Sequence, residues 1–326
     1  MATVETALGP VDVADLGFTL MHEHLMVKSA NLHDQWPHLD DLTARADEVA
    51  TQVRAAGDRG VRTIVDCTPP NMSRDVPLIR RIAAAATNVN VIFSTGVHPH
   101  FPVPYPFRYK APEETTDPDR MAELFVRDLT VGYADTGVKA GIIKAGTDPV
   151  LDRENEMMLR AAARAQVATG APITTHTRPK TKVGLMQQDV FAREGVDLSR
   201  VVIGHCGDST DFAYLSALCE RGSYIGMDRF GLDAPPWFRL TVEQRVDVVV
   251  EMCRRGYASQ MVMSHDSMCW CDFLSAEEKE TYMPRSRLTT IPDEVIPMLR
   301  ERISTEEIQL MTIDNPRRIF AAGAGE

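Results

Sequence analysis

Short apolar, β-branched runs recur along the chain, and each is followed by a stretch with the start and stop signals of a helix. Runs that are apolar throughout are typical of parallel strands covered on both faces. Eight such runs can be read, at Phe18–His24, Thr63–Asp66, Val91–Gly96, Gly141–Lys144, Pro172–His176, Val201–His205, Tyr224–Asp228 and Met261–Asp266. Capping residues, capping-box spacing and closing glycines predict helices between them, for example at 117–137, 153–169, 209–222 and 241–256.

A strand followed by a helix, repeated eight times over about 250 residues, predicts an α/β protein with a (β/α)₈ TIM barrel. A doubly wound sheet uses the same alternation, but it usually carries a Gly-rich phosphate loop after its first strand. The first run here ends in His-Glu-His instead. We expect residues 1–326 to form one barrel domain, in which residues 1–17 make a short N-terminal hairpin or cap.

Composition and charge narrow the class of protein. The 326 residues are 44% hydrophobic and 25% charged, which is typical of a soluble globular protein. The net charge of −11 argues against nucleic acid or an anionic membrane surface as a partner. We find no signal peptide, no apolar run of the roughly 20 residues that span a bilayer, and no disulfide or zinc-ribbon spacing among the 6 cysteines. A cytoplasmic enzyme that acts on a small molecule is the expectation.

Polar residues gather where the predicted strands end. In a barrel these ends share one rim, the C-terminal face, where barrel enzymes place their active sites. Stability alone does not require several strands to end in histidine and one in lysine. The residues at these ends are His24, Asp66, Gly96 (with His98 just beyond), Lys144, His176, His205, Asp228 and Asp266.

The histidines and Asp266 have the chemistry of a metal site. His22 and His24 lie two apart on a strand, so both side chains point to the same face, with Cα atoms roughly 6.6 Å apart. Two imidazoles and the carboxylate of Asp266 can hold one ion, and the imidazoles of His176 and His205 can hold a second. Zn²⁺ suits this nitrogen and oxygen set, and Mn²⁺, Co²⁺ and Fe²⁺ remain open.

Lys144 occupies the position where an acid that bridges two ions would be expected. Burial lowers the pKa of a lysine, because the interior disfavours its charged form. A neutral amine can add CO₂ to give a carbamate, which is an anionic bridge with two oxygens. The alternative is a rim lysine paired with Asp66 or Asp228, and spacing leaves both interpretations open.

These motifs resemble those of the phosphotriesterase family of the amidohydrolase superfamily. The resemblance runs from about Gly9 to Phe320, and Ile-Gly-Met-Asp228-Arg229-Phe230 is most similar to the phosphotriesterase-like lactonases. The motifs that carry it are Gly-Phe-Thr-Leu-Met-His22-Glu-His24, Ala-Gly-Ile-Ile-Lys144, Ile-Thr-Thr-His176-Thr, Val-Val-Ile-Gly-His205-Cys-Gly-Asp and Met-Ser-His-Asp266.

The resemblance implies a binuclear metal centre and a homodimer. His22, His24 and Asp266 would hold the more buried ion, and His176 with His205 the more exposed one. Carboxylated Lys144 (N6-carboxylysine) and a hydroxide would bridge them. The hydroxide would attack a lactone or ester carbonyl, Asp266 would pass the proton to the leaving group, and organophosphate triesters would be promiscuous substrates.

Two loops depart from the lactonase pattern. His98 stands where the lactonases have Tyr after Thr-Gly-x, and it could bond the substrate, reach the exposed metal, or simply face solvent. In the eighth loop, Met283-Pro-Arg-Ser286 lacks the Trp that the lactonases often carry after Met-Pro. These differences favour, as an alternative function, the hydrolysis of another carboxylic or phosphate ester.

Three further residues are candidates for the substrate pocket. Arg229 directly follows a strand-end aspartate, so it could pair with Asp228 or frame the pocket. Trp237 and Trp270, in the predicted lid loops, could wall an apolar acyl pocket or form a dimer contact. A barrel without chemistry that serves as a scaffold would show broken ligand positions, whereas all six are filled here.

Overall fold

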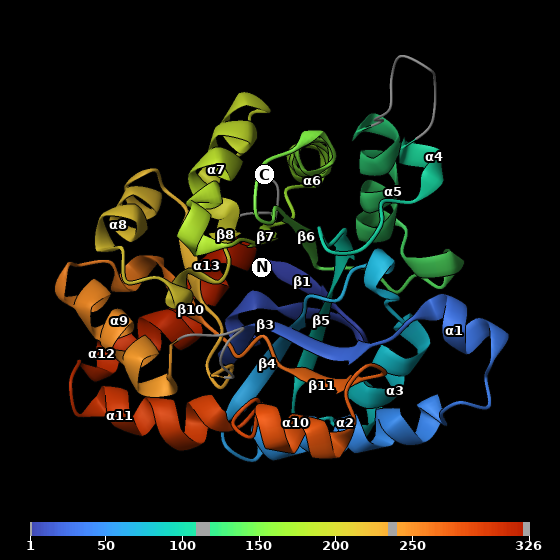
Figure 1. Ribbon diagram of the computed structural model, residues 1–326, viewed down its shortest axis with the longest axis horizontal. Coiled ribbons are helices and arrows are strands. Elements are labelled where there is room, and N and C mark those ends of the chain that lie inside the picture. Colours follow the sequence, from blue (N-terminus) through green and yellow to red (C-terminus); the bar gives the residue numbers. More distant parts are fainter. Residues whose placement is uncertain (1, 109–117, 234–239, 322–326) are drawn as a thin grey trace.

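The fold is a (β/α)₈ TIM barrel, as the sequence predicts. The computed structural model describes residues 2–108, 118–233 and 240–321, and shows a curved parallel sheet surrounded by helices (Figure 1). The strands lie side by side in chain order, and β11 adds to the outer edge of β3. The strands are β3 (Phe18–Val27), β4 (Val61–Asp66), β5 (Asn90–Gly96), β6 (Ile142–Gly146), β7 (Ile173–His176), β8 (Val201–Ile203), β9 (Tyr224–Met227), β10 (Met261–Met263) and β11 (Met268–Cys271).

Hydrogen bonds from the segment after β10 close the barrel against β3. The Asp266 backbone N–H donates to the His22 carbonyl (3.0 Å), and the His24 N–H donates to the Ser267 carbonyl (2.9 Å). The His22 N–H donates to Ser264 Oγ (2.8 Å). Barrel closure therefore brings Asp266 beside His22 and His24, although some 240 residues separate them in the chain.

The helices follow local signals in the sequence. Arg153–Thr169 is helical, with Gly170 in the left-handed conformation at its end, and the capping box of Thr241 and Gln244 is present. The helices are α1 (Ala30–Gln35), α2 (Leu42–Gly57), α3 (Val76–Ala85), α4 (Tyr105–Arg108), α5 (Pro118–Thr130), α6 (Arg153–Thr169), α7 (Val183–Arg193), α8 (Phe212–Glu220), α9 (Val242–Arg254), α10 (Ala276–Tyr282), α11 (Ile296–Arg300), α12 (Thr305–Gln309) and α13 (Asn315–Ala321).

Helix α5 ends earlier than the sequence predicts. The expected stop was Gly137, but the helix ends at Thr130. The N–H groups of Val131 and Gly132 both donate to the Arg127 carbonyl, and Gly132 has a φ of +105°. Gly132 is thus the glycine that terminates this helix, because its positive φ lets the chain turn away.

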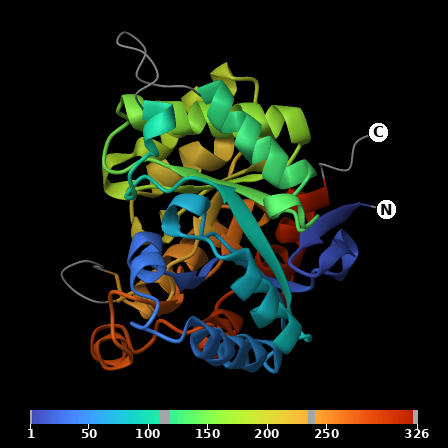
Figure 2. The same ribbon diagram turned by 90° about the vertical axis from the view of Figure 1, so that its right-hand side faces the viewer.

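An antiparallel hairpin precedes the barrel, formed by β1 (Thr3–Thr6) and β2 (Gly9–Asp12). The Ala7 N–H donates to the carbonyl of Val91, near the start of β5, and Figure 2 shows the hairpin beside α13. Val4 packs in one buried cluster with Ile142 and Phe320. The hairpin therefore covers the N-terminal end of the barrel, away from the rim that carries the polar residues.

Two expectations about the whole chain can be compared with the fold. All six cysteines are free and buried, in keeping with their irregular spacing. Within the described ranges, every helix is too short or too polar to cross a membrane.

Candidate metal centre

The side chains expected to hold the more buried ion converge from within β3 and β6 and from the segment after β10. His22 and His24 project from β3 toward the Asp266 carboxylate, with 3.7 Å and 3.3 Å between their Nε2 atoms and Asp266 Oδ1. Lys144, on β6, places its Nζ 2.5 Å from His22 Nε2. Four polar groups from three distant segments therefore face one point inside the rim.

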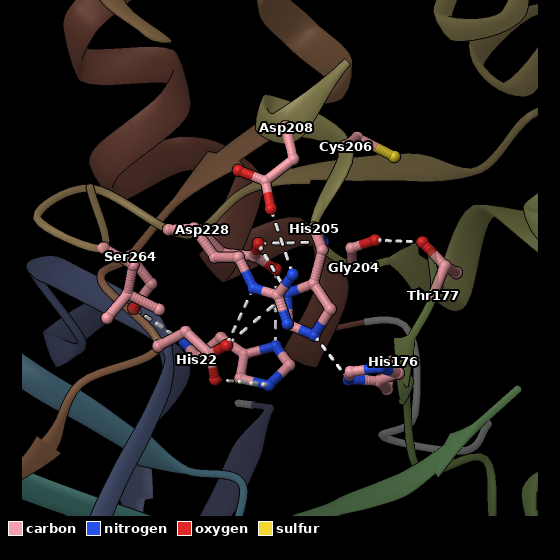
Figure 3. Close-up of polar contacts among 12 residues, drawn as sticks. His22, His176, Thr177, Gly204, His205, Cys206, Asp208, Asp228 and Ser264 are labelled. Carbon is pink, nitrogen blue, oxygen red and sulfur yellow. Dashed lines mark hydrogen bonds and ion pairs between the residues drawn. The ribbon is translucent and has the colours of Figure 1, made fainter. Parts of the chain in front are cut away.

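The two histidines expected to hold the more exposed ion lie next to this group. The Nδ1 atom of His176, at the end of β7, is 2.9 Å from Nε2 of His205, which follows β8 (Figure 3). His205 also joins the first group, since His22, His205 and Asp266 each offer one ligand atom within 4.8 Å of the others. All six predicted positions thus form one continuous cluster.

Two of these residues lie just beyond their strands in a strained backbone conformation. The strands β8 and β10 end at Ile203 and Met263, earlier than the sequence runs suggest. His205 and Asp266 have φ values of +63° and +54°, in the left-handed region that residues other than glycine rarely adopt. Such conformations cost of order 1–3 kcal/mol and persist at functional sites where the surroundings impose them.

Oxygen atoms behind the histidines fix their orientation. Asp228 Oδ1 lies 3.0 Å from His205 Nδ1 and accepts the His205 backbone N–H (2.8 Å), while its Oδ2 lies 3.4 Å from His22 Nδ1. Thr68 Oγ1 lies 3.0 Å from Nδ1 of His24. When Nδ1 carries the proton toward these oxygens, the Nε2 lone pairs point into the cluster, as in metal sites whose ligands are held by an outer layer of acceptors.

Among the described residues, neither Asp66 nor Asp228 forms an ion pair with Lys144, which was the alternative that spacing left open. Asp66 Oδ1 instead accepts the backbone N–H groups of Thr68 (3.1 Å) and Leu25 (3.4 Å). Asp228 contacts His205 and His22 instead. Lys144 is fully buried, and this burial lowers its pKa, which favours the neutral amine that reacts with CO₂.

The charges in the cluster match what a divalent cation requires. Burial and the nearby Lys144 lower the pKa of His22 to about 3, and burial likewise lowers the pKa values of His176 and His205. Burial alone would raise the pKa of Asp266, but His205, His24 and Arg229 hold it well below its ordinary value. Neutral imidazoles and an ionised carboxylate are the nitrogen and oxygen ligands that Zn²⁺ and similar ions bind.

The crowding of these atoms fits bound cations. Because Nδ1 of His205 faces Asp228, its Nε2 presents a lone pair to the nitrogen of His176 at 2.9 Å. Two lone pairs this close repel each other unless a proton or a cation lies between them. The residues present therefore fit a pair of divalent ions.

Arg229 contacts two carboxylates, those of Asp266 and Asp208. Its Nε donates to Asp266 Oδ2 (3.0 Å), and its Nη1 donates to Asp208 Oδ2 (3.0 Å). Asp208 also accepts from the buried Arg245 (2.6 Å). An arginine stays protonated at any accessible pH. Arg229 therefore holds Asp266 in place as an anion.

His98 lies inside the site and does not face solvent. It is 7% exposed, and its ring packs against His176 and Phe101 with centroid separations of 4.8 Å and 5.7 Å. Asn71 accepts the His98 backbone N–H (2.8 Å) and donates to its carbonyl (2.9 Å). The His100 backbone N–H donates to His98 Nδ1 (3.2 Å), so a neutral His98 carries its proton on Nε2.

Trp270 lies on β11, in the wall of a separate pocket of about 1000 Å³ between α2 and α10. Phe273, Leu274 and Met283 also line this pocket, and none of the six predicted ligands does. Leu274 and Phe101 both pack against the apolar cluster that includes Cys271, and Phe101 touches His98, so apolar side chains link His98 to the pocket. Trp237 lies outside the described residues.

Cys206 has no part in the site. Its Sγ donates to the Ile203 carbonyl (3.2 Å), and Figure 3 shows it directed away from His205. Both residues lie beyond β8, where His205 is left-handed and Cys206 begins a short 3₁₀ turn.

The comparisons with known proteins show the family to which the chain belongs. The model of the phosphotriesterase family matches residues 2–320. The chain belongs to the phosphotriesterase family. A solved structure described as the phosphotriesterase from Mycobacterium tuberculosis superposes with a TM-score of 0.93 at 44% identity, covering 99% of this chain and 100% of that one.

Relatives within the family carry different names. A phosphotriesterase homology protein of Mycobacterium tuberculosis is 46% identical, over 100% of this chain and 99% of its own. An aryldialkylphosphatase of Saccharolobus solfataricus is 34% identical (95% and 97% covered). A phospho-furanose lactonase of Mycoplasmopsis synoviae is 27% identical (97% and 91% covered). The family is thus established, and its named activities include those on phosphotriesters and lactones.

Proposed function

We propose that this protein is a binuclear metal-dependent hydrolase of lactones or related esters, with weaker activity on organophosphate triesters. The observation that carries the proposal is the cluster of six ligand positions, in which oriented imidazoles and Asp266 surround the buried Lys144. Two Zn²⁺ ions would be held by His22, His24 and Asp266 and by His176 and His205. Lys144, as its N6-carboxylated form, would contribute to both.

Asp266 is the proposed proton acceptor. When bound, the two cations would polarise the carbonyl or phosphoryl oxygen of the substrate and lower the pKa of a water molecule between them. Asp266 takes the proton of the attacking water and returns it to the leaving oxygen, while Arg229 keeps the carboxylate oriented through Oδ2. In a lactone the leaving oxygen stays tethered, so the product is a hydroxy acid.

His98 is the proposed substrate hydrogen-bond donor. Its Nε2 carries the proton, and its ring lies against His176, on the side of the more exposed ion. It can therefore donate to the substrate from the position where the lactonases have a tyrosine.

The apolar surface supports a lactone with an acyl substituent. Phe101, Met268 and Leu274 each pack against the same small apolar cluster, and Leu274 also lines the large pocket. The names aryldialkylphosphatase and phospho-furanose lactonase among the relatives support both of the proposed substrate classes.

A different carboxylic or phosphate ester is the second candidate. The large pocket is also lined by charged residues, among them Arg45, Glu48, Glu278 and Lys279. Such a lining suits a substituent more polar than an alkyl chain.

Proton release from a substrate panel distinguishes the two candidates. The metal-loaded enzyme, supplied with bicarbonate, would be given γ- and δ-lactones of graded acyl length, an aryl ester and an organophosphate triester. We expect fast lactone turnover that improves with chain length. Feeble turnover of every lactone by fully loaded enzyme would rule out the lactonase assignment and favour the second candidate.

We also propose that the protein is a cytoplasmic homodimer with no nucleic-acid or membrane partner, as the resemblance and the net charge of −11 suggest. Light scattering coupled to size exclusion tests the dimer, and a mass near the 36.2 kDa of one chain would contradict it.

A further inference from the structure

His176 has a carboxylate behind it that the ligand positions do not account for. Its Nδ1 faces His205, and its opposite nitrogen, Nε2, lies 3.5 Å from Asp148 Oδ2. This separation resembles the 3.4 Å between Asp228 and His22. The Asp148 side chain is only 3% exposed, although it lies on the loop that follows β6.

The backbone fixes Asp148 relative to His176. Gly146 pairs with His176 in the sheet, and a Cβ at Gly146 would lie 2.7 Å from the Cβ of His176. The Thr147 N–H donates to the His176 carbonyl (3.0 Å). Gln187, fully buried, donates both to that carbonyl (2.8 Å) and to Thr147 Oγ1 (3.0 Å). The two residues that precede Asp148 are therefore attached to the strand end that carries His176.

The carboxylate itself is clamped. Arg178 donates through Nε to Asp148 Oδ1 and through Nη2 to Oδ2 (2.8 Å). His100 Nε2 also contacts Oδ2. A bidentate arginine pair holds a carboxylate in a defined plane, which a single contact does not.

A third cation is the alternative for this group of atoms. His100, Asp148 and His176 each offer one ligand atom within 4.8 Å of the others. However, the guanidinium of Arg178 contacts both oxygens of Asp148 and already supplies the positive charge there. The arrangement therefore favours a carboxylate that orients His176 over one that binds an ion of its own.

We propose that Asp148 is a positioning residue, which accepts the Nε2 proton of His176 and so directs its Nδ1 lone pair to the more exposed metal ion. Arg178 and His100 hold Asp148 in place for this role. The inference rests on the binuclear centre proposed above. Carboxylates that orient a ligating histidine in this way typically change metal affinity about 10–100-fold.

Metal affinity, measured separately for the two ions, tests the role of Asp148. Metal-free wild type, Asp148→Ala and Asp148→Asn would be titrated with Zn²⁺ against a chromophoric chelator, and with Co²⁺ followed by its visible spectrum. Asp148→Asn keeps the shape of the side chain, so it remains informative if Asp148→Ala does not fold. We expect the second, more exposed ion to bind about 10–100-fold more weakly in Asp148→Ala than in wild type. In Asp148→Asn its affinity should fall by less. The affinity for the first, more buried ion should not change in either variant.

Arg178→Gln is the matched control. It breaks the same ion pair but leaves the carboxylate behind His176 without its clamp, so the affinity for the second ion should fall by less than in Asp148→Asn. A purely structural role would instead weaken metal binding equally in Arg178→Gln and Asp148→Asn.

Three results would overturn the inference. Unchanged affinity for both ions in Asp148→Asn and Asp148→Ala would remove the role of Asp148 and leave the proposed centre intact. A third ion in wild type, lost in these variants, would make Asp148 a ligand instead. Fewer than two ions in wild type would overturn the proposed centre itself.

Discussion

Lys144 is a fully buried lysine whose Nζ lies 2.5 Å from Nε2 of His22, and its burial lowers its pKa and so favours the uncharged amine that reacts with CO₂. We predict that Lys144→Ala abolishes turnover, because the anionic bridge is lost. Acetate or propionate should restore part of the activity by occupying the space of the carbamate, whereas acetamide, of similar size but uncharged, should not. Loss of turnover that no carboxylate reverses would leave Lys144 with only a structural role.

Asp266 contacts His22 and His24 through Oδ1 and Arg229 through Oδ2, so the effect of its substitution depends on which of these contacts is kept. Asp266→Asn keeps the shape and can still accept from Arg229, but it cannot take up a proton. We predict a fall in kcat of about 10²–10⁴-fold, with a much smaller change in KM. Steady-state kinetics on zinc-loaded protein, with metal content measured in parallel, provides the test. A rise in KM at normal kcat would contradict proton transfer by Asp266.

At the scale of single residues, the sequence indicated which candidate ligands gather at one rim but not what orients them. His22, His24 and Lys144 could be named because strand ends share one rim. Thr68 behind His24 and Asp208 behind Arg229 could not be assigned roles, because those contacts depend on the exact direction of side chains from different loops. Asp228 was visible as a strand-end residue, but its partners are His22 and His205, not Lys144.

Among the elements, strand β5 shows how closely neighbouring strands approach at the site. Gly96 pairs with Lys144 at a φ of +111°, and a Cβ there would lie 1.9 Å from the Lys144 carbonyl oxygen. Gly9, in the N-terminal hairpin, has a similar φ of +116° but open space around its Cα. Substituting each glycine therefore separates the free-energy cost of a positive φ from that of steric crowding.

We predict that Gly96→Ala destabilises the protein far more than Gly9→Ala. Gly9→Ala should cost about 1–3 kcal/mol from strain alone. Gly96→Ala adds displacement of the β6 backbone, worth about 1–3 kcal/mol or more, and should reduce metal binding through Lys144. Urea unfolding of both variants measures the difference, and equal losses would show that crowding at Lys144 is unimportant.

The element boundaries show where local patterns cease to predict structure. The apolar runs located all eight barrel strands, because burial on both faces imposes that pattern. They placed His205 and Asp266 at strand ends, whereas both lie beyond the strands in left-handed conformations. Barrel closure and contacts such as that between Asp228 and the His205 N–H impose these conformations, and no local sequence signal specifies them.

Across the whole molecule, the alternation of strands and helices predicted the barrel because it is a property of the entire chain. The large pocket could not be predicted, since it forms between α2 and the segment that contains β11 and α10, which lie far apart in the sequence. The site also gathers several buried histidines, and their lowered pKa values make the stability of the folded molecule depend on pH.

The metal-free protein should lose stability as the pH falls below neutral. Burial lowers the pKa of His22 from 6.5 to about 3, and it also lowers the pKa values of His98, His176 and His205. Below about pH 6.5 the unfolded chain binds protons that the folded chain does not, so each histidine removes up to about 1.4 kcal/mol per pH unit. Urea midpoints of chelated protein should therefore fall from about pH 7 to pH 5, and constant or rising midpoints would contradict this prediction.

The dependence of activity on bound metal tests the central claim most directly. Chelated protein would be titrated with Zn²⁺ in bicarbonate buffer while bound metal and turnover of a responsive lactone or ester are followed together. The binuclear centre predicts no turnover without metal and full turnover at two ions per chain. Turnover that survives complete removal of metal, or saturation with well under one ion bound, would contradict it.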